Sequence, residues 1–244
     1  MVMNPRTPFL ALLILLAAAA GLPARAADTE KTTAGDLVIT PIHHGSLMLQ
    51  FGGQAIHIDP WSQGDYSSLP RADLILITDI HQDHMDKAMV DKLKKESTVI
   101  IGPAAVAKTI LGMTVMNNGE KKQVGEIEIE AVPMYNIVRG PQPGALYHTK
   151  GRGNGYVLTL GGKRVYISGD TEAVPEMRAV KNIDIAFICM NLPYTMIPEE
   201  AAAAVKAFRP RIVYPYHYRG SDLNVFAAAL KNEKGVEVRL REWY

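Results

Sequence analysis

The chain has 244 residues, of which 48% are hydrophobic and 21% are charged, and this composition excludes an intrinsically disordered protein. The formal net charge is +1 and no basic tract is present, so we expect no nucleic-acid partner. The single cysteine, Cys189, excludes an intrachain disulfide and a cysteine-rich zinc module. A metal site would therefore have to be built from His, Asp, Glu or Asn side chains.

Residues 1–26 have the pattern of a secretory signal peptide. Arg6 precedes an apolar run from Phe9 to Ala20, and the small-residue sequence Ala24-Arg-Ala26 follows. The alternative is an uncleaved membrane anchor, but roughly a dozen apolar residues fall short of the ~20 that span a bilayer. We expect cleavage after Ala26, which would leave residues 27–244 as a single domain that is secreted or periplasmic and not attached to a membrane.

Two segments share a pattern that predicts a β-hairpin. Residues 47–58 and residues 156–167 each contain two apolar runs joined by a Gly-Gly turn. Each is followed by a loop that carries an aspartate and then by a strongly apolar strand, residues 73–78 in the first half and residues 184–189 in the second. This shared order predicts two similar halves.

Helices are expected between the strands. Pro198 and Ser221 stand where helix starts are expected. The candidate helices are residues 86–95, 103–110, 172–180, 198–208 and 221–230. Strands that alternate with helices, with a hairpin in each half, predict an α/β (α+β) fold in which two sheets pack face to face with helices outside, an αββα sandwich. Residues 136–154 form a long loop, and loops of that length are usually functional.

The strongest chemical signal is the sequence Thr78-Asp-Ile-His-Gln-Asp-His84, which directly follows an apolar strand. Four of its side chains are of a type that ligates metals, namely Asp79, His81, Asp83 and His84. A polar turn ahead of a helix would account for one aspartate and for neither histidine. We therefore expect a metal site at this strand end.

Two further groups are candidates for the same site. Asp170 follows Gly169, which permits a sharp turn at the end of a strand, although Gly-Asp is also a common turn. His217 follows the apolar sequence from Ile212 to Tyr216, although a lone histidine among tyrosines is more often a packed side chain. The predicted topology brings these strand ends to one edge of the sandwich, which favours both as ligands.

These residues resemble the metallo-β-lactamase superfamily, in particular its branch related to L-ascorbate-6-phosphate lactonase and N-acyl phosphatidylethanolamine phospholipase D. The resemblance covers nearly the whole chain after residue 26. The segments that carry it are His44-Gly-Ser46, Ile58-Asp-Pro60, Thr78 to His84, Ser168-Gly-Asp-Thr171 and Tyr214-Pro-Tyr-His217. It implies a hydrolase in which two divalent ions, zinc or else manganese or iron, activate a water molecule.

The resemblance also implies how the ligands are divided. Asp79 and His81 would form a first site. The second site would consist of Asp83, His84 and His217. Asp170 would bridge the two ions. The second-site aspartate, Asp83, would in addition orient the attacking water. The family motif has a histidine where this chain has Asp79, and a carboxylate favours harder ions than imidazole does, so the metal preference stays open.

The third ligand of the first site also departs from the family pattern. Many relatives place a histidine just after the strand equivalent to residues 127–133, where this chain has Met134-Tyr-Asn136. Asn136 has the expected position but offers a weak neutral ligand. His148, in the long loop, has the better chemistry, and we expect it to complete the first site.

Further side chains that follow strand ends could contact the metal ligands or the substrate. His44, Asp59 and Tyr194 are three of these candidates, and a structural role suits them equally well. Arg219 is available for an anionic substrate group. The other pocket candidates are Trp61, Met134, Met196 and Tyr218. The remaining histidines of interest, expected on the surface or on a strand face, are His43 and His57.

The fold and the metals do not fix the substrate, because lactones, phosphodiesters, amides and thioesters all suit a metal-activated water. We expect a secreted metal-dependent hydrolase that acts on a small molecule. The alternative is a periplasmic metal-binding or ligand-binding protein without turnover, which would keep the ligands but lack an open coordination position.

Overall fold

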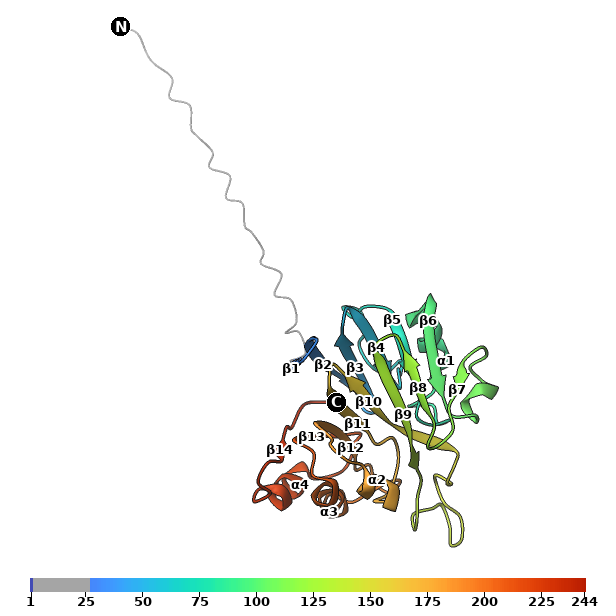
Figure 1. Ribbon diagram of the computed structural model, residues 1–244, viewed down its shortest axis with the longest axis vertical. Coiled ribbons are helices and arrows are strands. Elements are labelled where there is room, and N and C mark those ends of the chain that lie inside the picture. The colour runs from blue at the N-terminus through green and yellow to red at the C-terminus, as the bar shows by residue number, and fades with distance from the viewer. Residues whose placement is uncertain (2–26) are drawn as a thin grey trace.

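The computed structural model describes Met1 and residues 27–244, so the expected signal peptide lies outside the described residues apart from Met1. Two mixed sheets of seven strands pack face to face, and helices cover their outer faces (Figure 1). This arrangement is the αββα sandwich predicted from the sequence.

The two sheets repeat one pattern of strand pairing. The first sheet contains β1 (Asp28–Thr32), β2 (Gly35–His43), β3 (Ser46–Phe51), β4 (Gln54–Ile58), β5 (Ala72–Leu76), β6 (Lys94–Gly102) and β7 (Thr114–Val115). The second contains β8 (Lys121–Val124), β9 (Ile127–Met134), β10 (Gly153–Leu160), β11 (Lys163–Ile167), β12 (Ile185–Cys189), β13 (Ile212–Tyr216) and β14 (Glu237–Val238). In each sheet the first four strands pair antiparallel and the remaining neighbours pair parallel. The two similar halves are therefore present in the topology.

One helix has the predicted bounds, residues 198–208, and the other four are shorter than the sequence predicts. They are α1 (Lys87–Leu93), the 3-10 turn η1 (Val106–Lys108), α2 (Pro175–Ala179), α3 (Pro198–Phe208) and α4 (Leu223–Leu230). The helix predicted over residues 103–110 is wrong, since only one 3-10 turn forms there. The helix predicted to begin at Glu172 begins at Pro175, because the Glu172 carboxylate accepts the backbone N–H groups of Ile137 and Val138 in the long loop. Within residues 27–244, none of the helices has the length and apolar character needed to cross a bilayer.

In the first sheet, alternating side chains of a strand lie in two different cores. Leu47 and Leu49 of β3 lie in the core between the sheets, whereas Met48 packs in the core beneath α1. His57 of β4 pairs with Met48 in register and is fully buried on that outer face, where its Nε2 bonds the backbone carbonyl of Pro70 at 2.9 Å. His57 is thus a strand-face residue, as the sequence allowed, and His43 is half-buried at the end of β2.

Loops from the two sheets are hydrogen-bonded to each other at one edge of the sandwich. The backbone N–H of Asn154, in β10, donates to the carbonyl of Thr78 after β5, at 2.9 Å. The N–H of His217, after β13, donates to the carbonyl of His44 after β2, at 3.0 Å. These contacts bring the candidate site residues of both halves together.

Gly155 of β10 lies where the backbone approaches the end of β11 closely. A Cβ atom at this position would lie 2.9 Å from the carbonyl oxygens of Ile167 and Ser168. Because both are backbone atoms, Gly155→Ala should separate the strands and lower the free energy of unfolding by roughly 2 kcal/mol in urea titrations. Thr159→Ala, at a half-buried position of the same strand, is the control and should cost less. Equal losses in the two variants would contradict this account of Gly155.

Candidate metal centre

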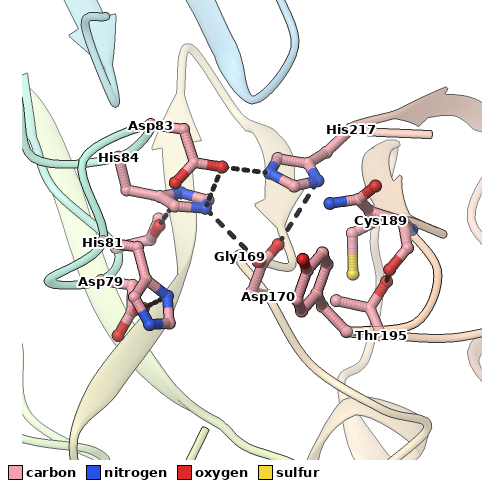
Figure 2. Close-up of polar contacts among 12 residues, drawn as sticks. Asp79, His81, Asp83, His84, Gly169, Asp170, Cys189, Thr195 and His217 are labelled. Carbon is pink, nitrogen blue, oxygen red and sulfur yellow. Dashed lines mark hydrogen bonds and ion pairs between the residues drawn. The ribbon is translucent and has the colours of Figure 1, made fainter. Parts of the chain in front are cut away.

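The loop after β5 folds back on itself. The backbone N–H groups of His84 and Met85 both donate to the carbonyl of His81, at 3.0 and 2.8 Å. This turn directs the side chains of the motif into the space between the strand ends of the two sheets (Figure 2). The structure brings together all seven side chains that the sequence indicated as ligands, in neighbouring clusters.

The first cluster consists of Asp79, His81 and His148, whose ligand atoms all lie within 4.8 Å of one another. The Asp79 Oδ2 atom is 2.7 Å from Nδ1 of His81 and 3.8 Å from Nε2 of His148. Asp79 and His148 are buried, whereas His81 is exposed, so the cluster faces the outside through His81. The three residues come from two distant segments, and the long loop supplies His148.

The second cluster consists of His84, Asp170 and His217, all of which are buried (Figure 2). The Asp170 Oδ2 atom lies 3.4 Å from Nε2 of His84, and its Oδ1 atom lies 3.6 Å from Nδ1 of His217. Asp83 lies beside this cluster, with Oδ2 3.2 Å from Nε2 of His217 and 3.7 Å from Nε2 of His84. Asp83 also forms a third group with His217 and His44.

Three polar atoms of the second cluster are buried without a hydrogen-bond partner in the described residues: His84 Nε2, Asp170 Oδ1 and His217 Nδ1. Leaving a buried polar atom without a hydrogen-bond partner costs roughly 1–3 kcal/mol of folding free energy. Three such atoms that face one another therefore indicate that a bound ion is their partner. Burial opposes the charged form of His84, yet the carboxylates of Asp83 and Asp170 raise its pKa well above the ordinary value. The cluster thus stabilises positive charge, and imidazole and carboxylate together fit a divalent cation.

Asp59 holds His84 from behind. Its buried carboxylate accepts hydrogen bonds from Nδ1 of His84 at 2.8 Å, from the backbone N–H of Thr78 at 2.7 Å and from the Thr78 hydroxyl at 2.5 Å. A carboxylate only accepts, so Nδ1 of His84 carries a proton, and Nε2 is the nitrogen that faces Asp170 and is available to a metal ion. Of the two roles that the sequence left open for Asp59, the structure shows contact with a candidate ligand.

Asn136 holds His148 in the same way. Its side-chain oxygen accepts hydrogen bonds from the backbone N–H of His148 at 2.8 Å and from His148 Nδ1 at 2.6 Å, and its amide nitrogen donates to the carbonyl of Tyr194 at 2.8 Å. Because the backbone N–H of His148 can only donate, the atom of the Asn136 amide that faces His148 is the oxygen. Nε2 of His148 is then left facing Asp79 and Asp170.

His44 connects Asp83 to Tyr244. Nε2 of His44 is 3.1 Å from Oδ2 of Asp83, and Nδ1 is 2.6 Å from the Tyr244 hydroxyl. Burial lowers the pKa of His44 to about 4, so its ring is neutral at pH 7. Because Asp83 only accepts, His44 donates from Nε2 and Tyr244 donates to Nδ1. The sequence carried no signal for Tyr244, which reaches the site from the far end of the chain.

Arg152 is another site residue that the sequence did not indicate. Its guanidinium group donates from Nε to Oδ1 of Asp79 at 3.1 Å and from Nη2 to Oδ2 at 3.0 Å. The flanking glycines, Gly151 and Gly153, were the available signal, because they mark a tight turn beside His148. The direction in which that turn points is set by tertiary contacts and could not be predicted from local sequence.

A pocket of about 600 Å³ opens above the clusters. Trp61, Tyr194 and Arg219 line it, as expected, together with Tyr147 and Leu192. The expectation for the other three candidates is wrong: Met134 and Met196 are fully buried, and Tyr218 packs its ring against Tyr244 with centroids 5.0 Å apart.

Met134 supports the turn that carries Asp170. Gly169 has φ of +60°, and a Cβ atom on it would lie 2.4 Å from the Met134 sulfur. Only glycine suits both this backbone conformation and this close approach. The side chain of Met134 therefore packs against Gly169 and does not line the pocket.

Comparison with known proteins agrees with this geometry. Residues 38–217 match the family described as "Beta-lactamase superfamily domain". A UPF0173 metal-dependent hydrolase of Thermus thermophilus is 31% identical over 210 residues, which cover 80% of this chain and 91% of the relative. A further UPF0173 metal-dependent hydrolase, from Symbiobacterium thermophilum, is 28% identical over 213 residues, which cover 82% of this chain and 89% of the relative.

Two solved structures are similar throughout. A proposed metal-dependent hydrolase from Parabacteroides distasonis superimposes with a TM-score of 0.85 at 43% identity and covers 90% of this chain and 100% of its own. The metallo hydrolase Igni18 from Ignicoccus hospitalis has a TM-score of 0.70 at 25% identity and covers 84% of this chain and 95% of its own. With the αββα fold and the His and Asp clusters at one edge of its sheets, the chain belongs to the metallo-β-lactamase superfamily and is a metal-dependent hydrolase.

Proposed function

We propose that the protein is a secreted hydrolase that binds two divalent ions and attacks a small ester-like substrate with a metal-activated water. The observation that carries the proposal is the set of three buried atoms on His84, Asp170 and His217 without a hydrogen-bond partner among the described residues, beside an open pocket that Asp170 lines. Secretion rests on the pattern in residues 1–26, and a mature N-terminus at Ala27 in the secreted fraction would test it.

The distances support a division of ligands between two ions. The first would be held by Asp79, His81 and His148, and the second by His84, His217 and Asp170, with Asp83 on the other nitrogen of His217. Oδ2 of Asp170 lies 3.5 Å from Nε2 of His148 and 3.4 Å from Nε2 of His84, so this carboxylate is placed to bridge the ions. Two imidazoles and a carboxylate suit zinc at the second site, and metal analysis would distinguish zinc from manganese or iron.

Two divalent ions bound by these residues would lower the pKa of a bound water and polarise the bond under attack. Asp83 is half-buried at the pocket, and its Oδ2 accepts a hydrogen bond from Nε2 of His44, which fixes the carboxylate for orienting that water. Tyr244 keeps the proton of His44 on the nitrogen that faces Asp83. The chain needs no thiol nucleophile, and Cys189 is unsuited because burial raises the pKa of its thiol to about 12.

The pocket favours a substrate with an anionic group. Arg219 is exposed at the pocket, where its guanidinium group lies over the Tyr244 ring at 5.5 Å. Trp61, Tyr147 and Tyr194 add aromatic surface for the remainder of the molecule. Lactones, phosphodiesters and amides with a phosphate or carboxylate are compatible with this lining, and the L-ascorbate-6-phosphate lactonase branch stays a prediction.

The first test concerns the bridge. Asp170→Asn should release at least one equivalent of metal and lower hydrolysis at least about 100-fold, because the neutral amide no longer offsets the repulsion between two cations. Metal content by mass spectrometry and turnover report the two effects. Asp36→Asn, at an exposed aspartate paired with Lys31, is the control and should change neither. Unchanged metal content in Asp170→Asn would show that Asp170 is not a ligand.

The second test concerns His148 and Asn136. His148→Ala should weaken binding of the first ion by a large factor, because it removes a ligand. Asn136→Ala should weaken it less, because it removes only the hydrogen bond that orients the imidazole. Metal titration of both variants gives the ranking. The reverse ranking would make Asn136 the ligand and leave His148 outside the site.

The third test concerns the substrate. Paired esters, lactones and phosphodiesters, each with and without an added anionic group, should show higher kcat/KM for the anionic member, and Arg219→Met should remove the preference through KM. Equal rates for charged and neutral members in the wild type would contradict the role of Arg219. Bound metal with no turnover of any substrate would favour a non-catalytic binding protein instead.

A further inference from the structure

The ion pair between Arg152 and Asp79 lies inside the first cluster. Asp79 is fully buried, and both of its carboxylate oxygens accept a hydrogen bond from the guanidinium group, at 3.1 and 3.0 Å. The side chain of Arg152 is 20% exposed, so bulk solvent screens this pair only in part. The positive charge of Arg152 therefore lies beside Asp79, which is the one carboxylate that the first site does not share with the second.

The two clusters differ in charge for this reason. In the first, the negative charge of Asp79 is balanced by Arg152. In the second, Asp170 and Asp83 lie beside His84, and Asp59 lies behind it. Within residues 27–244, no lysine or arginine forms an ion pair with any of these three carboxylates. The second cluster is accordingly the more negative of the two, and a dication there has more charge to balance it.

One turn supplies both a ligand of the first cluster and the group that competes with the ion. His148 and Arg152 flank it, and the backbone N–H of Arg152 donates to the carbonyl of Thr149 at 3.1 Å. Lys150, between them, points away from the cluster to Glu176, with Nζ 2.6 Å from Oε1. The charge that acts on Asp79 is thus specific to Arg152 and is not a general property of a basic loop.

We propose that Arg152 makes the two metal sites unequal, so that the ion at His84, Asp170 and His217 binds first and tightly, whereas the ion at Asp79, His81 and His148 binds weakly. The inference rests on the proposed two-ion function. The guanidinium group repels a dication and draws charge from both oxygens of Asp79, so an ion at the first site is bound less tightly. At limiting metal the protein carries a single ion.

Titration of metal-stripped protein with Zn²⁺ against a competing chelator tests this. The wild type should show two binding steps that differ at least about tenfold in affinity. Arg152→Met should tighten the weak step about tenfold or more and leave the tight step unchanged, since one unit of repulsive charge is removed. Arg152→Lys keeps the charge but loses the two-pronged hydrogen bonding, and its weak step should lie between the two. Lys150→Met, on the same turn, is the matched control and should reproduce the wild type.

Other outcomes are distinguishable. A weak step that becomes weaker in Arg152→Met would mean that Arg152 positions Asp79 for the ion, and an unchanged step would mean that it has no effect; each overturns the inference. If Arg152→Met does not fold, as judged by circular dichroism, Arg152→Gln and Arg152→Lys decide by the same ranking. Two equal sites in the wild type would refute the inference alone, whereas no bound ion would refute the proposed function.

Discussion

The constraint on which the site depends is the burial of carboxylates and imidazoles at the ends of parallel strands, where they face one another without enough hydrogen-bond partners. Asp170 and His217 each carry an unsatisfied buried atom, and so does His84. Such groups are costly unless a cation joins them. The surrounding structure is arranged to keep them in this position, with Asp59 on the far nitrogen of His84 and Asn136 on the far nitrogen of His148.

Three of the five non-glycine residues with positive φ in the described part of the chain lie at the same place. His44, Asp59 and His217 have φ values of +54°, +44° and +47°, a region that non-glycine residues rarely occupy. Each follows a strand directly and turns its side chain toward the edge shared by the two sheets. Conformations of this kind persist when the surrounding packing determines them, and they cluster at functional sites. The rigid double sheet is therefore part of the chemistry, because it holds the strained turns and the ligands that they carry.

The site residues that lie close together in the sequence could be predicted. The residues that reach the site from distant parts of the chain could not. Asp79, His81, Asp83 and His84 follow one apolar strand, so their proximity follows from a single turn. The repeated hairpin pattern similarly indicated two halves, and the topology has them. Arg152 and Tyr244 reach the site through a loop and through the last residues of the sequence, whose paths depend on packing. The helix expected over residues 103–110 is a single 3-10 turn although its alanines favour a helix, because tertiary context overrides a weak local propensity.

Anomalous diffraction from crystals grown with Zn²⁺ tests the central claim most directly, since it locates ions without relying on activity. The account predicts a strong peak between Nε2 of His84, Nδ1 of His217 and the carboxylate of Asp170. It would be contradicted by density maps in which zinc occupies only surface positions while those three atoms face an ordered water or nothing.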